Sequence, residues 1–131
     1  MARATPDGHT IVLGYIANLG IGPSLYAKLP YDPVKDFAPV TLLAVAPNIL
    51  VAHPSVPVKN VRELVAFAKA NPNKVNYASA AVASLGHLAG ELLNSSAGIH
   101  MQHVPYKGSG QAVIDLLAGQ VQIMVSGMSS V

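Results

Sequence analysis

Two loops built from glycine, alanine and serine carry the residue types best suited to binding an anion. The first covers residues 79–84, with the sequence Ser-Ala-Ala-Val-Ala-Ser, and directly precedes a predicted helix. The start of a helix offers unpaired amide hydrogens and a partial positive charge, and small side chains let a ligand approach them. The two serine hydroxyls add hydrogen-bonding groups. This pattern predicts a cradle for a carboxylate, with an ordinary helix cap as the alternative.

The second loop, residues 106–110, combines the same small residues with a cation. Lys107 would attract an anion, and Gly108 and Gly110 would let it approach the backbone closely. The loop is not a dinucleotide-binding fingerprint, because Val113 stands where the third glycine would fall. An exposed turn before a helix is the alternative interpretation.

The histidines and acidic residues give no pattern typical of catalysis. His87 falls in the first turn of the helix after Ser84, where it would bind a ligand or move a proton, unless it packs against the sheet. His100 and His103 would lie on opposite faces of a strand, which is wrong for a shared metal ion. The six acidic residues form no acid–base pair, and the common hydrolase and zinc motifs are missing. We therefore predict a protein that is not an enzyme and uses no cofactor or metal.

Composition narrows the function further. The 131 residues are 51% hydrophobic and 11% charged, which excludes disorder and suits one small domain or a piece of a larger one. The net charge of +2 includes no basic tract, so nucleic acid is not an expected partner. Cysteine is absent, which excludes disulfides. No apolar run reaches the roughly 18 residues of a membrane span, and no secretory signal is predicted in this chain.

The elements that would position the two loops alternate regularly after residue 60. Asn60 and Glu63 are spaced as a capping box, which predicts the start of a helix. Helices are expected at residues 60–71, 84–96 and 111–117, and strands at 74–78, 100–104 and 121–125. Strands joined by helical crossovers run parallel, so the sheet is expected to bring both loops to its carboxyl edge.

The pattern before residue 60 is less regular. Strands are expected at residues 10–14, 37–43 and 49–51, with a short helix at residues 23–28. The proline-rich residues 53–57 predict a boundary between two parts of the chain. We therefore expect residues 1–52 to form part of one lobe, and residues 53–131 to form part of a second lobe with a βαβαβ unit.

Four runs of sequence together resemble the Bug-type, or tripartite tricarboxylate transporter, substrate-binding proteins of the bacterial periplasm. They are residues 25–40, 52–59, 87–92 and 103–110. The resemblance extends over essentially the whole chain. It implies an α/β fold like that of type II periplasmic binding proteins, with a parallel sheet flanked by helices. It also implies a periplasmic location, and two lobes that close on a small carboxylate or amino acid and deliver it to membrane transporter subunits.

The resemblance also implies which residues contact the ligand. Its cleft segments map onto Gly14, Asn18, Ser79, Ala80, Ala83, Ser84, His87, Tyr106, Lys107 and Gly108. Ala83 and Gly86 stand where the family leads us to expect glycine and proline. The family is about twice as long as this chain, so the chain is expected to be a middle portion and its fold incomplete relative to the two-domain fold.

An incomplete fold would leave apolar sheet edges open, which favours a homo-oligomer or a strand-exchanged dimer. The rival hypothesis is therefore a non-catalytic oligomeric interaction module that reuses the half-fold without a ligand. An α/β enzyme ranks last.

Overall fold

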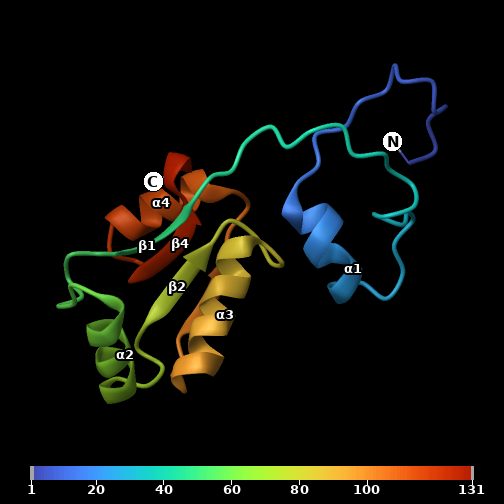
Figure 1. Cartoon of the computed structure of the whole chain (residues 1–131). Helices are drawn as coiled ribbons and strands as arrows, with labels where there is room; N and C mark the ends of the chain where they lie inside the picture. Colours follow the sequence, from blue (N-terminus) through green and yellow to red (C-terminus); the bar gives the residue numbers. More distant parts are fainter. Residues whose placement is uncertain (1, 131) are drawn as a thin grey trace. The chain divides into compact units, whose positions relative to one another are not determined.

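The computed structural model describes residues 2–130, which fall into two compact units (Figure 1). The first unit ends at Val45 and the second begins at Ala46. The second unit contains all the strands found among the described residues. It also contains the two loops that the sequence singled out.

The first unit is mostly irregular. A turn of π-helix, η1 (Ala17–Ile21), leads into the short helix α1 (Gly22–Leu25), which starts near Pro23. The predicted helix at residues 23–28 is thus shorter than expected, because Tyr26 is already extended, with φ −107° and ψ 122°.

Two predicted strands, residues 10–14 and 37–43, do not form. Residues 2–45 contain no strand at all, so neither segment has a neighbour to pair with its amides and carbonyls. Their apolar side chains are accordingly left in solvent: Ile11 is 77% exposed and Leu42 is 79% exposed. The strands predicted from the β-branched composition of these segments are therefore wrong, because residues 2–45 provide no strand for them to pair with.

The second unit is built on a four-stranded sheet with the order β1-β4-β2-β3. The strands are β1 (Asn48–Ala52), β2 (Asn76–Ser79), β3 (Gln102–Pro105) and β4 (Ile123–Gly127), and a 3-10 turn, η2 (Met128–Ser130), follows β4. Strand β2 runs parallel to β3 and β4, as predicted from the helical crossovers.

Strand β1 is antiparallel to β4 and pairs with it from Asn48, opposite Gly127, to Ala52, opposite Ile123. This pairing joins residues 48–52 to the second unit. The predicted boundary at residue 53 placed them in the first part of the chain, so the observed division falls earlier.

Three helices complete the second unit: α2 (Val61–Ala70), α3 (Leu85–Ala97) and α4 (Ser109–Leu117). The predicted cap of α2 is confirmed, because Asn60 Oδ1 accepts a hydrogen bond from the Glu63 amide at 3.0 Å. The Glu63 carboxylate reaches the amide of Lys59 at 2.7 Å, one residue earlier than in a standard capping box. Helix α3 ends at Gly98, whose left-handed φ of 60° suits glycine.

Side chains alternate across the sheet and form two apolar clusters. Tyr77 and Ile123 belong to one cluster with residues of α2, whereas Ala78 and Met124 belong to the other with residues of α4. The first cluster is Leu64, Ala68, Val75, Tyr77, Ile99, Met101 and Ile123. The second is Ala78, Ala112, Leu116, Val121 and Met124. The sheet is therefore a central layer with helices on both faces (Figure 1).

Two glycines let α3 lie close against the sheet. A Cβ atom at Gly86 would overlap the carbonyl oxygen of Val125, and one at Gly90 would overlap the ring of Tyr77. Both positions are buried and lie one turn apart on the same face of the helix. This close packing holds the amino end of α3 at the carboxyl edge of β2.

Candidate functional site

The two loops that the sequence singled out meet at the carboxyl edge of the sheet. Ser79 and Pro105 are paired at the ends of β2 and β3. Beyond this pair, the amide of Tyr106 donates to the Ser79 carbonyl at 2.9 Å, and the amide of Gly108 donates to the Ala80 carbonyl at 2.8 Å. The predicted convergence of the two loops is thus confirmed, and backbone hydrogen bonds hold them together.

The first loop delivers the amino end of α3 to this edge. Ser84 has an extended backbone and caps the helix, because its Oγ accepts a hydrogen bond from the His87 amide at 3.3 Å. The Ser84 amide donates to the Ala81 carbonyl at 3.3 Å and closes the turn. The cap leaves the first helical amides, those of Leu85 and Gly86, without an acceptor inside the helix.

Ala83 occupies a conformation that favours glycine. Its φ is 65°, in the left-handed region, which costs a residue with a side chain about 1–2 kcal/mol. Its amide donates to Nδ1 of His87 at 3.2 Å, and this bond holds the strained turn in place. The family resemblance led us to expect glycine at this position, and the backbone geometry explains that expectation.

The second loop delivers the amino end of α4. Gly108 is the N-cap residue of this helix and has a φ of 116°. No side chain forms a capping hydrogen bond at this amino end of α4. Lys107 beside it is exposed. The Tyr106 hydroxyl donates to Asp115 Oδ2 at 2.8 Å, and burial together with this carboxylate raises the pKa of Tyr106 to about 12. Tyr106 therefore stays neutral and ties the loop to α4.

The hydroxyl of Ser79 is directed inward rather than toward solvent. Ser79 is fully buried, and its Oγ donates to the Ala81 carbonyl at 2.9 Å. The same oxygen lies 2.7 Å from Nε2 of His103. Because a serine hydroxyl has one hydrogen, which the Ala81 carbonyl takes, Ser79 must accept its second bond from the imidazole. Ser79 thus shapes the loop from within.

A stack of three rings lies behind the first loop. The imidazoles of His87 and His103 are 4.0 Å apart with an interplanar angle of 18°, and Tyr77 stacks on His103 at 5.0 Å. The Tyr77 hydroxyl donates to Glu91 Oε1 at 2.6 Å, and burial followed by this carboxylate raises the pKa of Tyr77. Burial, and then the neighbouring His87, lower the pKa of His103 against a weaker opposing effect of Glu91.

Eight of the ten predicted ligand residues lie in or directly behind these two loops. They are Ser79, Ala80, Ala83, Ser84, His87, Tyr106, Lys107 and Gly108. Four of the eight make side-chain hydrogen bonds inside the protein, namely Ser79, Ser84, His87 and Tyr106. The surface left to a ligand is formed by the small residues and the helix amides, with Lys107 exposed beside them.

His103 is a residue of this site that sequence reasoning missed. Its spacing from His100 bears only on shared metal binding, whereas its partners come from other elements. The available signal was the pairing of β2 with β3, which puts Tyr77 and His103 side by side on one face. Ser79 shares that face because it lies two residues after Tyr77.

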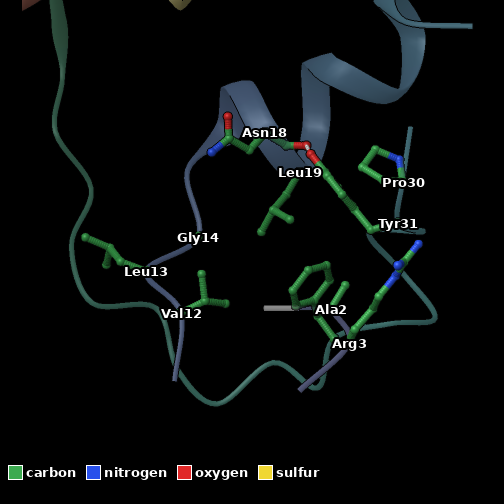
Figure 2. A pocket seen from close by; sticks show the side chains of 10 residues that line it. Ala2, Arg3, Val12, Leu13, Gly14, Asn18, Leu19, Pro30 and Tyr31 are labelled. Carbon is green, nitrogen blue, oxygen red and sulfur yellow. Dashed lines mark hydrogen bonds between the residues drawn. The ribbon is translucent and has the colours of Figure 1, made fainter. Parts of the chain in front are cut away.

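The other two predicted residues, Gly14 and Asn18, lie in the first unit. They line a cavity of about 390 Å³ together with Arg3 and with apolar side chains (Figure 2). Figure 2 shows the side chain of Tyr31 reaching toward Asn18, whose carbonyl accepts its hydroxyl at 2.7 Å. The ring of Phe37 meets Tyr31 edge-on at 5.8 Å. The cavity is thus mostly apolar, with one cationic side chain at its wall.

Residues 2–130 contain no group of three histidine or acidic side chains arranged to hold a metal ion. None of the described helices combines the length and the apolarity needed to cross a membrane.

Comparisons with known proteins agree on one family. The model of the tripartite tricarboxylate transporter family receptor matches residues 1–131. Protein BugT of Bordetella pertussis is 37% identical over 131 residues. The structure of an R. palustris protein with adipate superimposes with a TM-score of 0.88 at 33% identity. The structure of MatC from Rhodopseudomonas palustris with bound malate gives 0.82 at 34%.

These matches cover nearly all of this chain but less than half of each relative. The alignment with BugT includes 99% of this chain and 40% of BugT. The two structural alignments include 98% of this chain, with 43% of the adipate-bound protein and 44% of MatC. The chain therefore spans about two fifths of the length of the relatives it matches.

Proposed function

Because the chain belongs to the tripartite tricarboxylate transporter receptor family, we propose that it forms part of a solute-binding protein for small carboxylates. In this proposal it acts in the periplasm and presents its ligand to membrane transporter subunits. It binds and releases the ligand without changing it, so it is not an enzyme and needs no cofactor.

The observation that carries this proposal is the junction of the two loops. Hydrogen bonds from Tyr106 and Gly108 to the first loop place the amino ends of α3 and α4 at one edge of the sheet. Amide hydrogens and helix dipoles at two such ends favour an anion between them. Lys107 adds a positive charge that is exposed to solvent. A carboxylate is one of the anions that such a site can hold.

The proposed ligand class comes from related proteins and is compatible with the polarity of this surface. Ala80 and Gly108 leave space near the backbone but add no polar side-chain group of their own. Selectivity would then depend on the carboxylate and on the length of the chain attached to it. Related proteins were solved with adipate and with malate, which are both dicarboxylates. We propose small dicarboxylates as the first ligands to test, with amino acids next.

Gly14 and Asn18 belong to this proposal as contacts from the other lobe. The unit that ends at Val45 would contribute to one lobe and the unit that begins at Ala46 to the second, as in the two-lobed proteins of the family. The cavity that Gly14 and Asn18 line is mostly apolar, which suits the hydrocarbon part of such a ligand.

Nuclear magnetic resonance titration of the amides tests the proposal directly. Adipate and malate at millimolar concentration should shift the amide signals of residues 80–86 and 107–111. Lys107→Ala should weaken this response, whereas Lys69→Ala, at an exposed position in the last turn of α2, should leave it unchanged. If neither dicarboxylate moves these signals, the loops do not form a carboxylate site.

One observation favours the second candidate function, a non-catalytic interaction module. Large apolar side chains of the first unit are strongly exposed. They include Ile11, Leu13, Val34, Val40, Leu42, Leu43 and Val45. Such a surface usually associates with another one. Sedimentation at micromolar concentration separates the two candidates, since a monomer that binds adipate fits only the first.

A further inference from the structure

The hydrogen bonds of the His87–His103 pair determine where its protons lie. An amide can only donate, so the bond from Ala83 requires a lone pair on Nδ1 of His87. The hydroxyl of Ser79 already donates to a carbonyl, so Nε2 of His103 must carry a hydrogen. Both rings therefore satisfy their partners when they are neutral and carry their proton on Nε2.

Protonation of this arrangement breaks one of its bonds. A proton on Nδ1 of His87 would face the amide hydrogen of Ala83, so an attraction would become a repulsion. The second ring is stacked 4.0 Å away, and two charged imidazoles at this distance repel each other. His103 could take a proton on Nδ1 and keep its bond to Ser79, but only at the cost of a charge in a half-buried stack.

The other ionisable groups around the pair do not offset the unfavourable effect of protonating it. Helix α3 contributes Glu91, whose carboxylate is already bound by the Tyr77 hydroxyl from β2. Its effect on the pKa of His103 is smaller than the opposing effects of burial and of His87. The β4 residues nearest this face, Ile123 and Val125, have no ionisable side chain. Acidification therefore destabilises the arrangement in which both stacked imidazoles are neutral.

We propose that His87 and His103 act as a proton-sensitive latch that holds residues 79–84 in the binding conformation. With both rings neutral, the latch fixes the strained turn at Ala83 through its amide and the interior of the loop through Ser79. Uptake of a proton releases the turn and moves the amides at the start of α3 out of position. The effect on ligand affinity rests on the proposed function, whereas the latch itself does not.

Two side-chain replacements imitate the neutral rings without their ability to take a proton. In His87→Asn the amide oxygen can occupy the place of Nδ1 and accept from Ala83. In His103→Gln the amide nitrogen can occupy the place of Nε2 and donate to Ser79. His100→Asn is the matched control, because His100 is exposed and lies outside the stack.

The first experiment follows the Ala83 amide signal and the imidazole nitrogens of the ligand-free protein by nuclear magnetic resonance. As the pH is lowered from neutral, the Ala83 amide should move together with the His87 nitrogens, both rings starting as the Nε2-protonated form. His87→Asn should abolish this movement and His100→Asn should preserve it. An Ala83 amide that ignores pH in the parent protein overturns the latch, as does a neutral His87 carrying its proton on Nδ1.

The second experiment measures adipate affinity at neutral and at mildly acidic pH. The parent should bind more weakly at the acidic pH, because a protonated latch must lose its proton before the loop returns to the binding conformation. His87→Asn and His103→Gln should reduce the ratio of the affinity at neutral pH to the affinity at acidic pH. Protonation of adipate itself affects all variants equally. Equal ratios in parent and both variants would overturn the coupling. If adipate fails to bind at either pH while the Ala83 amide still responds, the proposed function fails and the latch stands.

Discussion

The amide of Gly108 donates to the carbonyl of Ala80 at 2.8 Å, beyond the last paired residues of β2 and β3. This bond extends the ladder of the sheet into two loops that are far apart in the sequence. It places the uncapped start of α4 next to the turn that leads into α3. The candidate site therefore depends on the rigidity of the sheet more than on either loop alone.

Ala83→Gly should stabilise the protein by about 1 kcal/mol. The substitution removes about 1–2 kcal/mol of strain at the left-handed position, against a smaller entropic cost from the more flexible unfolded chain. Chemical denaturation of the two proteins measures the difference. Ala81→Gly is the control, because this residue lacks the positive φ and should only lose stability. A loss of stability in Ala83→Gly would show that the turn is unstrained.

Gly90→Ala should destabilise the protein by about 1–3 kcal/mol. The new Cβ would overlap the buried Tyr77 ring, so either the helix or the ring has to move. Gly110→Ala adds the same methyl group to α4 where no atom lies within 4 Å, and should be neutral or stabilising. Thermal denaturation compares the two variants. Equal melting temperatures would contradict the close packing of α3.

Ser84→Ala should weaken carboxylate binding by about 1–2 kcal/mol and lower the stability by about 1 kcal/mol. The serine caps α3 and presents its hydroxyl at the proposed anion site. Asn60→Ala removes a similar cap from α2 and should cost stability without affecting binding. Calorimetric titration with adipate gives the affinities. Unchanged binding in Ser84→Ala would remove this hydroxyl from the site.

Stability should fall as the pH is lowered from neutral, and His103 should account for part of the fall. Burial lowers the pKa of His103 in the folded protein, whereas the unfolded chain keeps the usual value of about 6.5. Below that value the unfolded chain binds more protons, so the free energy of unfolding decreases as the pH falls further. Above about pH 6.5 the contribution of His103 to the free energy of unfolding is fully present. Melting temperatures of the parent and His103→Gln should therefore converge on acidification, and parallel curves would contradict this.

Much of the second unit could be predicted from its sequence because its signals are local. Caps at Asn60 and Ser84 and the glycine at residue 98 determine where helices begin and end. The alternation of strands and helices then requires parallel pairing. Strand β1 was predicted as a strand, but its antiparallel pairing with β4 depends on a contact across more than seventy residues, which no local pattern reports.

The first unit shows the opposite case. Residues 10–14 and 37–43 have the composition of strands, yet a strand also needs a partner, which residues 2–45 do not supply. The site was predicted only in part for a related reason. The loops and helix ends could be recognised one by one, whereas the contact of His103 with Ser79 and His87 joins three elements and depends on the register of the sheet.

The antiparallel pairing of β1 with β4 has a practical consequence for protein engineering. Met128 donates its amide to the carbonyl of Pro47 at 3.1 Å, so residues 47 and 128 lie side by side at one end of the β1–β4 pair. A segment with adjacent ends can be spliced into a surface loop of a host protein with little distortion of either partner. Residues 47 and 128 are therefore suitable attachment points for such a splice, with both loops between them.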